Sequence, residues 1–194
     1  MMNWENRCNQ ALAVVKRSVS PARYLHIEGV VQTAMILATR YSLDPMAIRM
    51  AAILHDRTKE LPKPQQLKLL EEVKPDLMTL KSPALWHAKT AHYLAIHEFQ
   101  LSEEWAEPIR WHTTGRENMS LSDMVLYVAD QIEPGREFYD PKDMELAQNN
   151  IYAAMKKILQ AKLMFTMQKG QPLHQDSLAC WNWLCTSSPR VYEA

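Results

Sequence analysis

The feature that most restricts the fold of this chain is a helical period that continues along almost its whole length. Only four glycines occur in 194 residues, and no run alternates apolar and polar side chains as a half-buried strand does. In one segment, for example, apolar side chains recur every three or four residues, as at Ile27, Val30 and Ala34. The sequence therefore predicts an all-α protein, built as a helical bundle.

Prolines and capping residues divide this pattern into separate helices. Asp44 is a good capping residue and is followed by Pro45 at the first helical position, whereas Pro62 and Pro64 interrupt the period. The predicted helices cover residues 3–17, 21–41, 45–59, 65–73, 84–99, 103–112, 121–133, 141–167 and 176–184.

The length suits one ordinary domain with a real core, and two domains would be cramped. There is no internal repeat and no linker rich enough to mark a boundary. We expect residues 1–170 to form the domain and residues 171–194 to form a C-terminal helical appendage packed on it. Tryptophans and cysteines gather in that appendage, which also makes a homodimer possible.

Charge and cysteine usage limit the partners and the compartment. Lysines plus arginines equal aspartates plus glutamates, at 22 each, so no overall basic field favours nucleic acid or a membrane surface as a partner. The three cysteines are an odd, widely spread set, as expected of free thiols in a reducing cytoplasm. No apolar run approaches the roughly 20 residues that span a bilayer. We therefore expect a cytoplasmic protein whose anionic ligands are bound by a local cluster.

The stretch AAILHDRTKEL, residues 51–61, places an ionisable pair at the end of an apolar helix. A buried charge is costly unless it is paired or coordinates a metal. The pair His55–Asp56 alone is weak evidence, because a histidine at a helix C-terminus beside a solvated aspartate would be equally ordinary. The question is whether other helices supply further ligands.

Two more side chains of the right kind lie on apolar helix faces. His26 shares a face with Val30 and Ala34, and Asp130 lies within the apolar run MVLYVADQIEP. An aspartate there is expensive without a cation. Two imidazoles and two carboxylates suit iron, manganese or zinc better than calcium.

Several cations and hydroxyls accompany these residues. Arg23 precedes His26 by one helical turn and Lys59 follows Asp56 by the same step, so each pair can face one pocket. The turn Thr113-Thr114-Gly115-Arg116 offers hydroxyls and backbone N–H groups, and Arg136 follows a second glycine turn. Three other histidines, His92, His97 and His174, we expect to lie away from the site, with His97 solvated and His174 on the surface.

In combination these motifs resemble the HD-domain metallohydrolases, an all-helical superfamily with the pattern His…His-Asp…Asp. The chain is similar in particular to the YqeK branch, the symmetrically cleaving bis(5′-nucleosyl)-tetraphosphatases. The resembling segments cover roughly residues 10–165, and they are RYLHIEGVVQTAMILA, AAILHDRTKEL, LWHAKTAHYLA and IRWHTTGRENMSLSDMVLYVADQIEPGR with the helix that follows. Their order is far more specific than any one motif.

The resemblance implies a ligand set and a reaction. It makes His26, His55, Asp56 and Asp130 the ligands of a divalent metal, most simply iron, with manganese or another transition metal as alternatives. It also places His87 and His112 in the pocket, either on substrate phosphates or at a second metal position. The implied reaction splits diadenosine tetraphosphate and related dinucleoside polyphosphates into two nucleoside diphosphates, ADP in the case of diadenosine tetraphosphate.

We assign Asp56 and Lys59 to catalysis. The residues assigned to substrate binding are Arg23, His87, His112, Thr113, Thr114, Gly115 and Arg136. One departure from the family is the pair Arg57–Thr58, where smaller or apolar residues are more usual. It leaves the ligands intact but can change the pocket wall or the role of Lys59.

Three alternatives stay open at this point. The same site could act on another nucleotide, such as a monophosphate, a cyclic nucleotide or an alarmone. A non-catalytic helical regulatory module would fit the fold, although all four ligands are present. An HD-type oxygenase with two irons would need His87 and His112 as further ligands.

Overall fold

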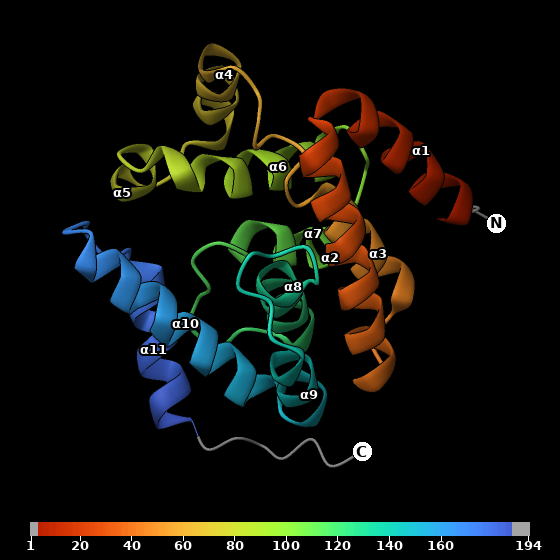
Figure 1. The fold of residues 1–194 in the computed structure, drawn as a ribbon. Helices are drawn as coiled ribbons and strands as arrows, with labels where there is room; N and C mark the ends of the chain where they lie inside the picture. The colour runs from red at the N-terminus through yellow and green to blue at the C-terminus, as the bar shows by residue number, and fades with distance from the viewer. Residues whose placement is uncertain (1–3, 188–194) are drawn as a thin grey trace.

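Two central helices, α2 (Pro21–Arg40) and α8 (Leu121–Ile132), pack against each other, and the other helices are arranged around them (Figure 1). The structure is a computed structural model and describes residues 4–187. Its helices also include α1 (Trp4–Ser18), α3 (Pro45–Leu54), α4 (Lys63–Val73), α5 (Leu77–Leu80), the 3₁₀ helix η1 (Pro83–Leu85), α6 (Trp86–His97), α7 (Glu103–Trp111), α9 (Pro141–Asn149), α10 (Ile151–Gln168) and α11 (Gln175–Thr186). No strand occurs within residues 4–187. The predicted all-α class is confirmed.

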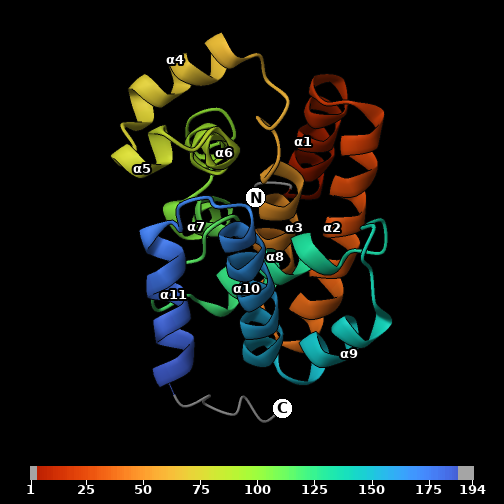
Figure 2. The ribbon, with the colours of Figure 1, turned by 60° about the vertical axis from the view of Figure 1, so that its left-hand side comes forward.

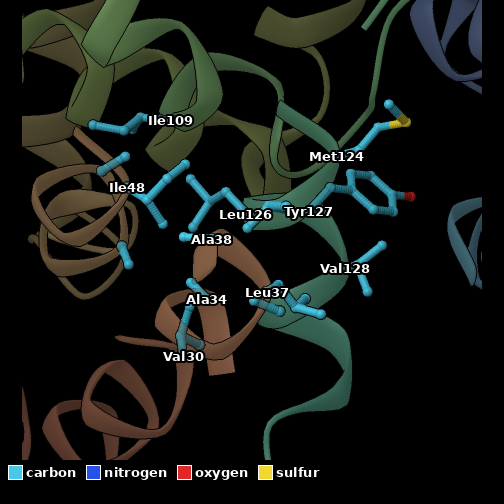
Figure 3. Packing of buried hydrophobic residues seen from close by; sticks show 14 of the residues in the cluster. Val30, Ala34, Leu37, Ala38, Ile48, Ile109, Met124, Leu126, Tyr127 and Val128 are labelled. Atoms are coloured by element: carbon cyan, nitrogen blue, oxygen red, sulfur yellow. The ribbon is translucent and has the colours of Figure 1, made fainter. Parts of the chain in front are cut away.

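The core lies where α2, α3, α7 and α8 meet, as Figure 3 shows. Leu37 of α2, Leu126 of α8 and Ile48 of α3 have at most 1% of their surface exposed. Close packing of this kind fixes the angle between helices, and so it also fixes where the polar side chains at their ends project. The core therefore determines the geometry of any site built from α2, α3 and α8.

Side-chain caps set the start of α2, α3 and α8, the three helices that position His26, the pair His55–Asp56 and Asp130. Ser20 accepts a hydrogen bond from the Arg23 N–H at the start of α2, and Asp44 accepts from two backbone N–H groups at the start of α3. Ser120 and Asp123 form a reciprocal capping box at the start of α8. These starts agree with the predicted ones because capping residues are local signals.

The end of α3 was predicted wrongly. The helix stops at Leu54, and residues 55–60 form turns in which Arg57 N–H donates to Leu54 O and Lys59 N–H donates to Asp56 O. In an α-helix, neighbouring side chains point about 100° apart. His55 still has helical backbone angles, and the turns that follow it place Asp56 beside the same centre.

The long helix predicted over residues 141–167 is also wrong, because Asn150 separates α9 from α10. Asn150 is extended, with φ −156° and ψ 94°, and its side chain accepts from Ala153 N–H. The Tyr41 hydroxyl donates to Ala147 O at 2.6 Å and accepts from Ile151 N–H at 2.9 Å. A side chain more than 100 residues away thus satisfies the backbone groups that the break exposes.

The remaining differences are smaller. The short helices α5 and η1 were not predicted, and the start predicted at residue 84 falls in η1, so that α6 itself begins at Trp86. Most other ends differ by one or two residues. Helix α11 packs on α10, whereas residue 3 of the first predicted helix and residues 188–194 of the predicted appendage lie outside the described residues. The division at residue 170 stays a prediction.

Among residues 4–187, none of the helices combines the length and the apolar character that crossing a membrane requires.

The role of Tyr41 can be tested by replacing it with phenylalanine. Tyr41→Phe leaves the Ile151 N–H and the Ala147 carbonyl without their partner, and we expect the free energy of unfolding to fall by about 1–3 kcal/mol. Urea denaturation followed by helical circular dichroism measures this. The exposed Tyr139→Phe is the control, with an expected change within about 0.5 kcal/mol. Equal effects of the two substitutions would contradict the role given to Tyr41.

Candidate metal centre and active site

Three helices bring two histidines and two aspartates of the predicted site together. His26 comes from α2, His55 and Asp56 follow α3, and Asp130 lies in α8. His26 Nε2 is 3.1 Å from Asp130 Oδ1 and 3.7 Å from Asp56 Oδ2. His55 Nε2 is 3.6 Å and 3.7 Å from the same two oxygens. The four side chains present their donor atoms to one point, although they are spread over more than 100 residues of sequence.

The protonation of the two imidazoles suits a metal ion. His55 Nδ1 lies 2.7 Å from Ala52 O, and because a carbonyl oxygen can only accept, Nδ1 must carry the proton. In the neutral ring, Nε2 of His55 is therefore the atom that is free to bind a cation. Although burial lowers the pKa of His55, the neighbouring Asp56 and Asp130 outweigh it and raise the pKa, so the two acids favour positive charge at this position. Nε2 of His26 and Nε2 of His55 are both buried and make no hydrogen bond. Orphaned ring nitrogens beside two carboxylates are a donor set that fits a divalent transition metal.

Glu133 orients His26. The sequence did not predict this role, although Glu133 lies within the motif IEPGR. Its Oε1 is 3.1 Å from His26 Nδ1, and its Oε2 accepts from Gly135 N–H at 2.6 Å. A carboxylate on the far nitrogen of a ligating histidine fixes the ring and raises its basicity. A Cβ on Gly29 would lie 2.3 Å from Glu133 Oε2, so the glycine provides the space for this carboxylate.

A second cluster shares Asp56 with the first. His87 Nε2 is 3.2 Å and His112 Nε2 is 3.7 Å from Asp56 Oδ1, the oxygen that faces away from His26 and His55. The two Nε2 atoms are 3.1 Å apart. His112 Nδ1 lies 2.7 Å from Ile109 O, which again leaves Nε2 as the free donor atom of the neutral ring. Asp56 thus faces one imidazole pair with each of its oxygens.

Charge compensation determines the protonation state of this centre. Burial alone would raise the pKa of Asp56, but the neighbouring His55, His112 and His87 outweigh it and hold the pKa well below its ordinary value. The pKa of Asp130 is also well below its ordinary value, because the neighbouring imidazoles of His26 and His55 outweigh burial. Burial, together with the charge of His112, holds the pKa of His87 well below its ordinary value. The carboxylates are therefore ionised and His87 is neutral, as metal ligation requires.

Two arginines and a lysine surround the carboxylates. Arg23 Nη1 is 2.7 Å from Asp56 Oδ2, and Arg136 Nη2 is 2.5 Å from Asp130 Oδ1. Lys59 Nζ is 3.1 Å from His87 Nε2, and burial lowers the pKa of this lysine. The sequence predicted all three near the pocket, and the structure places them there.

A cavity of about 430 Å³ opens beside the centre. The predicted site residues that line it are Arg23, Asp56, Lys59, His87, His112, Thr113, Thr114, Asp130 and Arg136. His26 and His55 lie behind this wall. Gly115 is not in the wall: it has φ +68°, and a Cβ on it would lie 2.8 Å from Cys180 Sγ. Gly115 therefore serves the turn and its packing against α11.

The unusual pair Arg57–Thr58 has a structural explanation at Thr58. The buried Thr58 hydroxyl donates to His87 O at 3.0 Å and lies 2.7 Å from Thr90 Oγ1. The hydroxyl thereby ties the turn after α3 to α6. Thr58 supports the backbone of His87 and leaves the ligands unchanged.

His92 and His97 lie outside the centre, as expected, but the prediction for His174 is wrong, because it is buried and lines the cavity. His174 has 6% of its surface exposed, and its Nδ1 accepts from Asp176 N–H as the cap of α11. His97 is exposed, as predicted. His92 lies 3.1 Å from Glu103 Oε1, beside Glu107, in a separate group whose Glu103 side chain is 61% exposed.

The chain is similar in sequence to one known family and to proteins that share one name. A family model described as "HD domain" matches residues 23–135. The chain is 36% identical over 182 residues to "Bis(5'-nucleosyl)-tetraphosphatase, symmetrical" of Bacillus subtilis (strain 168), covering 92% of this chain and 98% of that protein. It is 34% identical over 178 residues to the protein of the same name from Halalkalibacterium halodurans, covering 90% and 95%.

A solved structure is also similar. It is described as a "predicted HD superfamily hydrolase involved in NAD metabolism" from Clostridium acetobutylicum. The TM-score is 0.86 at 29% identity, and the match covers 92% of this chain and 96% of that one. Family and fold thus agree with the geometry of the centre.

The orienting role of Glu133 predicts a measurable loss of metal affinity. Glu133→Ala removes the carboxylate that fixes His26, and we expect the affinity for Mn²⁺ or Zn²⁺ to fall by about 10–100-fold. Chelator competition measures the affinity, and circular dichroism checks that the helices remain. The control is Glu137→Ala in the same loop, where the side chain is exposed. An unchanged affinity in Glu133→Ala would exclude the role.

Proposed function

Because this chain belongs to the HD-domain family and, within it, to the symmetrical bis(5′-nucleosyl)-tetraphosphatases, we propose that it hydrolyses diadenosine tetraphosphate and related dinucleoside polyphosphates. Cleavage between the two inner phosphorus atoms of diadenosine tetraphosphate gives two ADP. The single observation that best supports this is the convergence of His26, His55, Asp56 and Asp130 beside a cavity lined with cations.

The same four side chains are the proposed metal ligands. Two imidazole nitrogens and two carboxylates form a borderline-to-hard donor set, which supports iron, with manganese or another transition metal as alternatives. A divalent cation held there would polarise a phosphoryl oxygen as a Lewis acid. It would also lower the pKa of water toward neutral pH. Glu133 keeps His26 in the orientation that ligation needs.

The other side chains neutralise and position the polyphosphate. Arg23 and Arg136 are already paired with the ligand carboxylates and can turn their remaining N–H groups toward phosphate oxygens. The Lys59 ammonium, next to His87, places positive charge where negative charge develops on the departing diphosphate. Asp56 contributes through its two oxygens, each directed to a different imidazole pair.

His87 and His112 have two possible roles, and these predict different metal contents. If they bind phosphate oxygens, the protein holds one ion per chain. If they complete a second position that shares Asp56, it holds two. Metal analysis of the purified protein per chain decides between the roles.

The proposal retains three further expectations from the sequence: a cytoplasmic location, no nucleic-acid or membrane partner, and a possible homodimer.

Product analysis tests the reaction directly. We expect the protein purified with iron or manganese to convert diadenosine tetraphosphate to ADP alone, because cleavage at the centre of the chain leaves two phosphates on each adenosine. Chromatography separates the nucleotides. AMP plus ATP would exclude symmetrical cleavage, and equal or faster turnover of mononucleotides in the same panel would favour another HD-type substrate.

Replacement of one ligand tests the metal site. We expect Asp130→Asn to lower metal occupancy and turnover while leaving the helical content intact, because a neutral amide is a much weaker ligand than a carboxylate. Asp143→Asn in α9, outside the cavity wall, is the matched control. Full occupancy in Asp130→Asn would remove Asp130 from the ligand set.

A further inference from the structure

The cavity extends beyond the part of the chain that matches the HD domain. That match ends at residue 135, but α10 and the segment that joins it to α11 form the far wall of the cavity. Helix α10 packs on α8, and Figure 2 shows α10 and α11 side by side. Among the α10 residues in this wall is Lys162, which no sequence motif singles out.

Lys162 differs from the arginines in the cavity wall in having no carboxylate partner within the described residues. Its ammonium donates to Thr113 O at 2.8 Å and lies 4.7 Å from the centre of the Tyr127 ring. Arg23 and Arg136, by contrast, are each paired with an aspartate of the centre. A neutral carbonyl and a ring face leave most of the positive charge of Lys162 uncompensated.

Burial makes the positive charge of Lys162 unfavourable. Burial lowers the pKa of Lys162 to about 8, even though Asp130 acts in the opposite direction. An anion in the cavity would favour the ammonium form by direct Coulomb attraction in a region of low dielectric. The lysine is therefore suited to gain from anion binding.

Two hydroxyls next to Lys162 are also without partners. The Oγ1 atoms of Thr113 and Thr114 are buried and make no hydrogen bond, and both residues line the cavity. Buried hydroxyls normally have a partner, so two hydroxyls left unpaired by the protein are available to a polar group bound in the cavity. Lys162 donates to the carbonyl of the first of these two residues, which places ammonium and hydroxyls in one part of the wall.

We propose that Lys162, together with the hydroxyls of Thr113 and Thr114, forms a phosphate subsite for the nucleoside diphosphate half that lies away from the metal ligands. The inference rests on the proposed function, because a four-phosphate chain needs a binding site on both sides of the bond that is cleaved. It assigns part of the substrate specificity to α10, outside the HD-domain match.

Lysine labelling of the wild-type protein tests the subsite without any substitution. The metal-loaded protein is acetylated at pH 8 with and without ADP, and the modification of each lysine is read by peptide mass spectrometry. We expect ADP to protect Lys162 and Lys59, and to leave the exposed Lys169 unprotected. Protection of Lys59 without protection of Lys162 would overturn the subsite while leaving the active site in place.

Variants give the second measurement. We expect Lys162→Met to raise KM for diadenosine tetraphosphate and the inhibition constant of ADP by about tenfold, with kcat nearly unchanged, since one charge-assisted hydrogen bond is lost. Lys162→Arg should restore most of the affinity, and Lys169→Met, the control at the C-cap of the same helix, should match the wild type. A purely structural lysine would instead lower kcat or stability and leave the inhibition constant of ADP unchanged.

The two proposals fail in different ways. Without turnover of diadenosine tetraphosphate by the wild-type protein, the proposed function is wrong. With normal turnover and an unchanged KM in Lys162→Met, only the phosphate subsite is wrong.

Discussion

The structure depends on compensating the negative charge of two buried carboxylates, those of Asp56 and Asp130. An isolated ionised carboxylate in a protein interior is strongly unfavourable. Here His26 and His55 face both acids, and Arg23 and Arg136 pair with one each. Because these partners come from different helices, the requirement for charge compensation links α2, the end of α3 and α8. A divalent cation would complete the compensation, since orphaned imidazole nitrogens point to the same place.

The surrounding architecture can be understood from this requirement. The early end of α3 lets two adjacent residues face one centre, and Gly29 leaves room for the Glu133 carboxylate that holds His26. The His87–His112 pair extends the polar region to a second face of Asp56, from which the cavity continues to Lys162 on α10. The part that matches the HD domain thus contributes the His–Asp centre, and the C-terminal helices contribute the far wall of the cavity.

The sequence predicted what local signals and charge burial determine. Helix starts with Ser, Asp and Pro were correct to within a few residues, and the four convergent side chains were found because apolar helix faces containing His26 and Asp130 need a cation. The break at Asn150 was missed because Tyr41, distant in sequence, stabilises it. Lys162 was missed because it resembles any other lysine of a helix that also carries Lys156 and Lys157. In both cases tertiary contacts determine the outcome.

Anomalous diffraction from crystals of the metal-loaded protein tests the central claim most directly. The account predicts a peak at the absorption edge of the bound metal, about 2.0–2.2 Å from His26 Nε2, His55 Nε2 and one oxygen each of Asp56 and Asp130. A peak beside His92 and Glu103, with no peak at this centre, would contradict it.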